Sequence, residues 1–287
     1  MIKDVLLNNG VKMPQEGFGV FQITDLAQCT QVVLDAIETG YRLFDTAAAY
    51  NNETAVGEAI RQSGLKREEF FITTKIGMDS IGEEKARAGF ERQLKLLGLD
   101  YLDLYLVHMP WGDYYGAWRT LEALYKEGRI RAIGVSNFSP ERLMDLKYNF
   151  DIIPAVNQIE LHPLYQREDE LKFMRDMGIQ PQAWAPFAEG FGGMFTNPVL
   201  KVIAQKHQRT VGQVILRWNV QRGVAIIPKT VRKERMQENI SIWDFELDED
   251  DMQAIALLDL GHPQMLRTND PSEVQRVYEF SKNPRIR

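Results

Sequence analysis

The sequence predicts a single (β/α)8 barrel, an α/β fold in which eight parallel strands alternate with helices. Eight short apolar segments alternate with amphipathic stretches of helical periodicity. Early strand starts recur at intervals of about 30 residues, the length of one βα unit, and no linker rich in Pro, Gly or Ser interrupts them. The competing fold is a doubly wound nucleotide-binding sheet, but no G-x-G-x-x-G follows an early strand. We therefore expect residues 1–287 to form one barrel domain.

The expected elements follow in chain order. An N-terminal β-hairpin is predicted around Asn8-Asn9-Gly10, because Asn and Gly tolerate the positive φ of tight turns. The eight strands are expected at 17–21, 41–47, 70–75, 102–108, 132–137, 155–160, 182–186 and 225–230. Helices between them include 27–39, 83–97, 118–127 and 211–221, with Gly40, Gly98 and Gly128 placed as helix stops. Two additional helices are expected at 197–208 and 248–259, and coil after Gly261.

Composition excludes several function classes. The chain of 287 residues has 34 Lys and Arg against 40 Asp and Glu, a formal charge of −6, which argues against a dedicated nucleic-acid binder. No apolar run approaches the roughly 18 residues of a membrane span, so we expect a cytoplasmic protein with no membrane partner. Cys29 is the only cysteine and H-E-x-x-H is absent, so no disulfide and no metal site is expected. A monomer is the default expectation, because barrels of this size bury their cores alone.

Polar residues end most of the predicted strands. In a barrel the carboxyl ends of the strands meet at one mouth, where active sites lie. Each such residue has an ordinary explanation, since Asp can cap a helix and Lys can reach solvent. Their convergence on one rim nevertheless favours a shared site. The residues are Asp45, Lys75, His108, Ser136, Asn137, Gln158, Glu160 and Lys229.

Proton donation to a carbonyl oxygen is the chemistry that these residue types suggest together with the nearby Tyr50. A tyrosine hydroxyl has a reference pKa near 10, and an adjacent ammonium such as that of Lys75 is expected to lower this pKa. Asp45 would pair with Lys75 and keep it protonated. His108 would donate a hydrogen bond to the substrate oxygen and orient it.

Three motifs resemble those of the aldo-keto reductases, and the resemblance covers nearly the whole chain. They are GYRLFDTAAAYNNETAVG (40–57), LDLYLVHMP (102–110) with ITTKI (72–76) before it, and IPKTVRKERMQENI (227–240). The resemblance implies a catalytic tetrad of Asp45, Tyr50, Lys75 and His108, with Tyr50 as the general acid. It also implies NADPH-dependent reduction of aldehydes and ketones to alcohols by hydride transfer.

The resemblance further implies which residues hold the NADPH cofactor. Ser136, Asn137 and Gln158 would hold its carboxamide, and Trp184 would stack on the nicotinamide ring. Its 2′-phosphate would meet Lys229, Thr230 and Arg235, with Arg232 adding positive charge, and adenine would meet Glu238 and Asn239. This basic cluster in a chain of charge −6 favours NADPH over NADH. The alternative interpretation of the cluster is a solvated basic helix.

Departures from the family pattern concern mainly the substrate pocket. Phe21 and Met109 stand where tryptophans are frequent, and with Trp111 they are expected to wall an open apolar pocket for a small-molecule carbonyl substrate. Small aldehydes, ketoaldehydes or keto-sugars fit this expectation. The tail is expected to be solvated and mobile, the alternative being that its arginines attract anionic substrates. Those arginines are Arg267, Arg276 and Arg285.

Two other functions stay open at this stage. One is a Schiff-base lyase using Lys75, since a lysine at a strand end attacks carbonyls once its pKa falls. The charge of Asp45 opposes that change. The other is a non-catalytic regulatory subunit that binds NADPH as a redox sensor.

Overall fold

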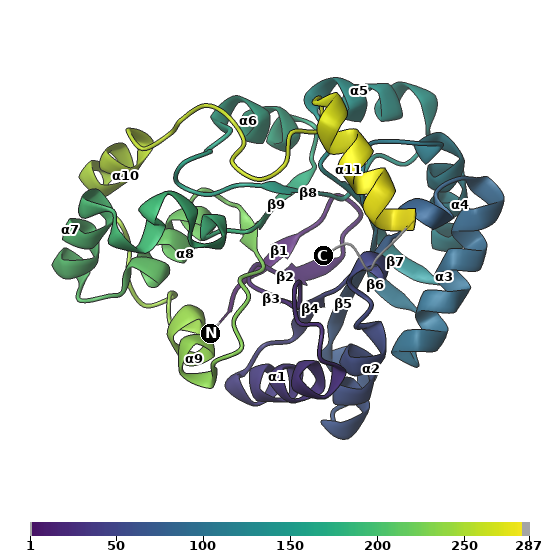
Figure 1. The fold of residues 1–287 in the computed structure, drawn as a ribbon, viewed down its shortest axis with the longest axis horizontal. Helices are drawn as coiled ribbons and strands as arrows, with labels where there is room; N and C mark the ends of the chain where they lie inside the picture. Colours follow the sequence, from purple (N-terminus) through teal and green to yellow (C-terminus); the bar gives the residue numbers. More distant parts are fainter. Residues whose placement is uncertain (1, 283–287) are drawn as a thin grey trace.

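Eight parallel strands form the centre of the molecule, and each strand pairs with its neighbours in chain order (Figure 1). The computed structural model describes residues 2–282. The predicted barrel fold is therefore confirmed. The strands are β3 (Phe18–Gly19), β4 (Leu43–Asp45), β5 (Phe71–Ile76), β6 (Leu102–Val107), β7 (Ile130–Ser136), β8 (Val156–Glu160), β9 (Gln180–Trp184) and β10 (Ala225–Ile226).

Backbone hydrogen bonds between the first and last strands close the barrel. Gly17 N donates to Ile226 O at 2.8 Å, and Ile226 N donates to Gln15 O at 2.8 Å. Gly19 N donates to Pro228 O at 3.1 Å. A Cβ at Gly19 would lie 3.0 Å from Ile227 O, so the glycine lets the two backbones approach this closely. Closure brings the segment after β10 beside the start of the barrel.

A helix follows every strand and packs on the outer face of the barrel (Figure 1). Local capping agrees with the sequence: Gly40 and Gly98 end helices with φ of 116° and 65°, and Asp25 caps the first helix. The helices are α1 (Leu26–Thr39), α2 (Glu53–Gln62), α3 (Glu83–Leu97), α4 (Tyr114–Lys126), α5 (Pro140–Asn149), α6 (Glu168–Asp176), α7 (Pro198–His207), α8 (Val211–Gln221), α9 (Lys233–Ile240), α10 (Glu249–Ala256) and α11 (Pro271–Lys282).

The N-terminal hairpin closes the amino-terminal end of the barrel. It consists of β1 (Asp4–Leu6) and β2 (Lys12–Pro14). The buried side chains of Leu7 and Met13 join the interior cluster of the barrel with Phe71 at the start of β5. The hairpin tip is tied to the barrel by Asn8 Nδ2, which donates to Pro154 O at 3.0 Å. The hairpin thus covers the end of the barrel opposite to the carboxyl ends of the strands.

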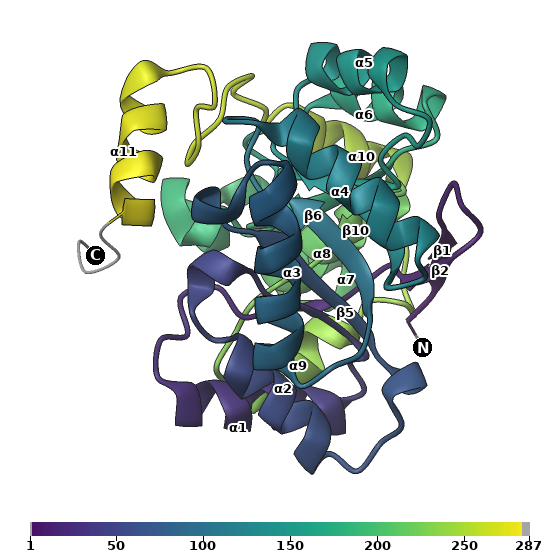
Figure 2. The same cartoon turned by 90° about the vertical axis from the view of Figure 1, so that its right-hand side faces the viewer.

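The two helices expected beyond the eightfold plan are present as α7 and α10. The expectation of coil after Gly261 is wrong for residues 271–282, because α11 covers Pro271–Lys282. Figure 2 shows α11 and the hairpin at opposite ends of the barrel. The helix packs on the short helix η3 (Met78–Ser80), which follows β5. This contact joins residues about 190 positions apart in the chain, so the sequence of residues 261–287 alone does not reveal it.

We predict that Gly57→Ala destabilises the fold, because a Cβ at Gly57 of α2 would lie 2.1 Å from Leu97 O. Overpacking of this kind costs about 1–3 kcal/mol. Gly212→Ala in α8 is the matched control, since its Cβ would meet neighbours only at 3.6 Å or more. The measurement is urea-induced unfolding of both variants. Equal unfolding midpoints for the two would contradict the close contact between α2 and α3.

Candidate active site

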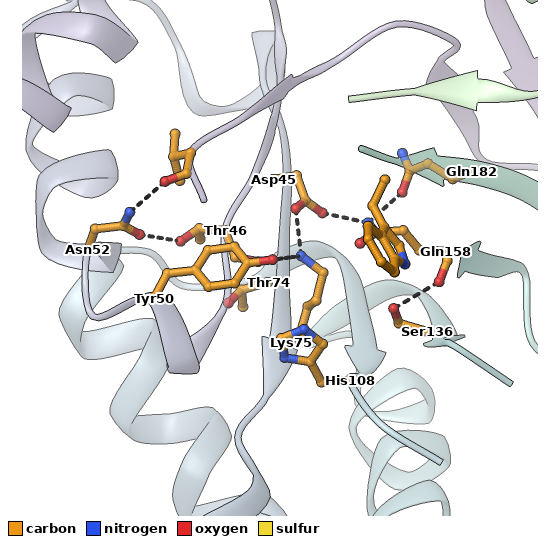
Figure 3. A network of polar contacts seen from close by, with 12 residues as sticks. Asp45, Thr46, Tyr50, Asn52, Thr74, Lys75, His108, Ser136, Gln158 and Gln182 are labelled. Carbon is orange, nitrogen blue, oxygen red and sulfur yellow. Dashed lines mark hydrogen bonds and ion pairs between the residues drawn. The ribbon is translucent and has the colours of Figure 1, made fainter. Parts of the chain in front are cut away.

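Lys75 lies at the centre of a polar network at the barrel mouth (Figure 3). Its side chain is 0% exposed, near the end of β5. Its ammonium has three acceptors: Asp45 Oδ1 at 2.5 Å, Thr46 O at 3.0 Å and Tyr50 Oη at 3.3 Å. All three N–H groups of the ammonium are thus satisfied. Because Lys75 donates to Tyr50, the hydroxyl hydrogen of Tyr50 is left to donate elsewhere.

The electrostatics of this centre keep Lys75 charged. Burial alone lowers the pKa of Lys75, but Asp45 and Tyr50 outweigh it and raise the pKa above the ordinary value. This agrees with the role expected of Asp45.

The expected lowering of the Tyr50 pKa is wrong in this structure. Burial is the largest effect and raises the pKa of Tyr50 above 10.0, while Lys75 lowers it and Asp45 raises it again. The ammonium acts in the expected direction, but removal of water from around the phenol has the larger effect. Tyr50 is therefore protonated at neutral pH.

His108 follows β6, and its ring lies beside Tyr50, with ring centroids 6.0 Å apart in an edge arrangement. Burial, and next the charge of Lys75, lower the pKa of His108 to about 3. The imidazole is therefore neutral near pH 7 and offers one N–H and one acceptor nitrogen.

Hydrogen bonds fix the amide of Gln158, on β8. Gln158 Nε2 donates to Asp45 Oδ2 and to Gln182 Oε1, both at 2.8 Å (Figure 3). A carboxylate only accepts, so this orientation of the amide is the one that chemistry allows. The carbonyl oxygen Oε1 of Gln158 is left as an acceptor. Gln182, on β9, was missed by sequence reasoning; the signal was a polar residue two positions before Trp184, on the same inward face of the strand.

The side chains of Asn137 and Trp184 are bonded to each other. Trp184 Nε1 donates to Asn137 Oδ1 at 2.8 Å, and Asn137 Nδ2 donates to His108 O at 3.1 Å. Ser136 Oγ donates to Gln158 O at 2.8 Å. The ends of β6, β7, β8 and β9 are thereby joined, and the indole of Trp184 is held in one orientation.

The predicted basic cluster lies after β10. Lys229, Arg232 and Arg235 are exposed, and among residues 2–282 their side chains form no ion pair. Thr230 is buried, and its Oγ1 accepts from Arg232 N at 3.2 Å. Lys233 differs from its neighbours, because its Nζ lies 2.6 Å from Glu38 on α1.

The remaining two predicted cofactor residues lie on α9, next to the start of α8. Glu238 Oε1 accepts from Thr210 Oγ1 at 2.5 Å, and Asn239 is buried. A Cβ at Gly212 would lie 3.6 Å from Glu238 and 3.7 Å from Phe187, so the loop after β9 also reaches this place. In that loop Ala185 adopts a left-handed φ of 46°.

The three predicted substrate residues lie in different environments. Phe21 is 44% exposed, and its ring centroid lies 4.9 Å from that of Tyr50. Met109 is buried, with its Sδ 3.5 Å from Asn137 Nδ2. Trp111 is buried, and its Nε1 donates to Thr268 O at 3.2 Å.

Two observations indicate that these residues fit a nicotinamide cofactor. At the ends of β8 and β9, the free carbonyl oxygen of Gln158 and the flat ring of Trp184 match an amide-bearing aromatic ring. After β10, three exposed cations that have no acidic partner within residues 2–282 match a phosphate group. No group of His, Cys, Asp and Glu among residues 2–282 has the arrangement of a metal site.

Comparison with known proteins identifies the family. A model of the aldo/keto reductase family matches residues 17–259. The chain belongs to the aldo/keto reductase family. The resemblance inferred from the sequence is therefore confirmed, and this aldo/keto reductase is an oxidoreductase that acts on carbonyl groups.

Curated relatives and solved structures agree with this assignment. Glyoxal reductase of Bacillus subtilis is 48% identical over 259 residues, 90% of this chain and 93% of its own. Methylglyoxal reductase DkgA of Escherichia coli O157:H7 is 42% identical over 260 residues, 90% of this chain and 94% of its own. The crystal structure of an aldo-keto reductase of Bombyx mori in complex with NADP has a TM-score of 0.88 and 33% identity, over 96% of this chain and 97% of its own.

Proposed function

We propose that the protein is an NADPH-dependent reductase of small aldehydes and ketoaldehydes, with Tyr50 as the proton donor. The observation that carries this proposal is the bonding of Lys75, whose three donors are satisfied by Asp45, Thr46 and Tyr50. This leaves a protonated phenol with a free hydrogen, beside a fixed positive charge.

The proposed reaction adds a hydride and a proton to a carbonyl group. When bound, the nicotinamide cofactor supplies the hydride to the carbonyl carbon. Tyr50 donates its hydroxyl proton to the carbonyl oxygen, and the ammonium of Lys75 stabilises the phenolate that results. Asp45 holds the ammonium in place and keeps it charged. The high pKa of Tyr50 keeps the proton available at neutral pH.

His108 is proposed to orient the substrate. Because its pKa is about 3, it is neutral and donates a hydrogen bond to the carbonyl oxygen without losing a proton. Its ring lies next to that of Tyr50, so both groups can reach one oxygen atom. In this proposal Tyr50 donates the proton, and His108 donates only a hydrogen bond that orients the carbonyl.

The cofactor is proposed to extend from Trp184 to the cluster of Lys229, Arg232 and Arg235. Gln158 and Ser136 would hold the carboxamide, with Asn137 fixing the indole of Trp184 against the ring. Thr230 would add a hydroxyl at the 2′-phosphate. At the far end, Glu238 and Asn239 would contact adenine. The relative of known structure from Bombyx mori was crystallised with NADP.

The proposed substrates are small and carry an aldehyde next to a second carbonyl. Support comes from the names of the two relatives, a glyoxal reductase and a methylglyoxal reductase. Phe21 and Trp111 would form an apolar wall beside Tyr50. Arg276 gives no support for anionic substrates, because it pairs with Glu273 at 2.7 Å. Arg285 lies outside the described residues.

The proposed unit of function is a monomer of one domain. Every group named above belongs to one barrel, so the site is complete without a second chain. The Schiff-base alternative finds no support, because Lys75 is fully bonded and its pKa is raised.

We predict that Tyr50→Phe lowers kcat for methylglyoxal reduction by a factor of about 10²–10⁴, the usual contribution of a general acid. Binding of NADPH, followed by quenching of tryptophan fluorescence, is expected to change by less than about twofold, since the phenyl ring remains. Tyr148→Phe is the matched control, because Tyr148 is 82% exposed, on the outer helix α5. Near-normal turnover of the Tyr50 variant would refute the assignment of the acid.

We predict that Arg235→Ala weakens NADPH binding about 10- to 100-fold and leaves NADH binding nearly unchanged, because a charged hydrogen bond is worth about 1.5–3 kcal/mol. Lys233→Ala is the matched control: it removes a neighbouring cation that is already paired with Glu38. Both dissociation constants are measured by fluorescence titration. Equal losses of NADPH and NADH affinity would show that Arg235 does not meet the 2′-phosphate.

A further inference from the structure

Glu160, the last residue of β8, is a buried carboxylate bonded mainly to backbone N–H groups. It is 2% exposed. Its Oε1 accepts from Gln264 N at 2.6 Å, and its Oε2 accepts from Leu266 N at 3.0 Å. Met265 N contacts both oxygens, at 3.2 and 3.3 Å. His162 Nε2 lies 3.2 Å from Oε1 and completes the set.

These bonds join the barrel to a segment about 100 residues further along the chain. Three consecutive backbone N–H groups point at one carboxylate, and charged acceptors make the stronger hydrogen bonds. Burial of Glu160 opposes its charge, but the bonds from His162, Gln264 and Leu266 outweigh this effect and lower its pKa. The carboxylate is therefore ionised at neutral pH.

From this point the tail crosses one half of the barrel mouth. Thr268 O accepts from Trp111 Nε1 in the loop after β6. The ring of Tyr278 on α11 then lies 6.5 Å from that of Trp111, and α11 packs on η3 after β5. Figure 2 shows α11, in yellow, at the end of the barrel opposite to the hairpin, set apart from the strands. The tail thus spans the strand ends from β8 to β5, whereas the basic cluster lies after β10.

We propose that Glu160 is a positioning residue that holds residues 264–282 over the mouth and thereby fixes the wall of the substrate pocket at Trp111. The inference rests on the proposed function for the identity of the pocket, but not for the attachment of the tail. Without Glu160, three backbone N–H groups lose their acceptor, and the tail keeps the contacts of Trp111 and α11 and the packing of Met265 on the core. The wall that faces a bulky substituent on the substrate then becomes mobile.

Glu160→Gln tests the attachment directly. The variant keeps the size of the side chain and one acceptor oxygen, but the NH₂ group that replaces the other oxygen cannot accept, so at least one of the three N–H groups of residues 264–266 loses its acceptor. Hydrogen exchange, followed by mass spectrometry, is expected to be at least tenfold faster in residues 264–282 and unchanged in β5 and β6. Glu127→Gln is the matched control, since Glu127 is exposed and pairs with Arg87 on the outer helices. Unchanged protection of the tail in the Glu160 variant would overturn the proposal.

The effect on specificity is measured with methylglyoxal and phenylglyoxal, which share the reacting aldehyde and differ in the substituent. In Glu160→Gln, KM for phenylglyoxal is expected to rise at least fivefold. We expect kcat for methylglyoxal and the dissociation constant of NADPH to stay within twofold. Faster exchange of the tail with an unchanged ratio of kcat/KM for the two substrates would refute the role in specificity.

A second variant and a readout that does not depend on activity separate failure of this inference from failure of the proposed function. If Glu160→Gln does not fold, Gln264→Pro removes the N–H that donates to Glu160 at 2.6 Å without changing the barrel, and the same shifts are expected. If the wild-type protein reduces neither aldehyde, the proposed function fails together with the role in specificity. The exchange experiment still decides whether Glu160 holds the tail.

Discussion

The buried ion pair of Lys75 and Asp45 is the constraint on which the rest of the site depends. Lys75 is fully buried and Asp45 is 2% exposed, so either charge would strongly destabilise the fold if the other were absent. Loss of one partner of such a pair typically costs about 3–5 kcal/mol. The pair in turn orients two neighbours: Lys75 donates to Tyr50, and Asp45 accepts from Gln158. One interaction therefore links the proposed proton donor to the proposed cofactor site.

Residues with different proposed roles lie at different strand ends around the barrel mouth. The ends of β4, β5 and β6 carry Asp45, Lys75 and His108, the residues that we propose control the proton donor and orient the carbonyl. The ends of β7 to β10 carry the groups suited to an extended cofactor. The C-terminal tail covers the part from β5 to β8 and is bonded to Glu160. If Glu160 has the role proposed above, substrate selection can vary through the tail while the residues at the ends of β4, β5 and β6 stay the same.

Sequence patterns predicted the barrel, its eight strands and the residues at the strand ends. The alternation of strands and helices and the polar residues at the strand ends can both be recognised from neighbouring residues in the chain. Alternation of apolar and amphipathic segments records burial, and a polar residue at the end of a buried strand stands out. The motif around Tyr50 also predicted the family, and the basic segment after β10 predicted the cofactor NADPH.

The features that sequence reasoning missed arise from contacts between distant residues. Nothing near Leu266 reveals that its N–H meets Glu160, and nothing near Trp184 shows that its indole is bonded to Asn137. The predicted lowering of the Tyr50 pKa was wrong for a related reason. The motif shows the neighbouring ammonium, but the loss of water around the phenol depends on the whole packed mouth, including Phe21.

The most direct test of the account is the pH dependence of kcat/KM for methylglyoxal reduction at saturating NADPH. The proposed reaction needs Tyr50 protonated, and burial raises the pKa of Tyr50 above its ordinary value, while His108, with a pKa of about 3, stays neutral throughout the working range. The account predicts a constant kcat/KM between pH 5 and 9 and a decline only above about pH 10. A decline with an apparent pKa near 6.5 would contradict it, because the proton would then come from a histidine of ordinary pKa.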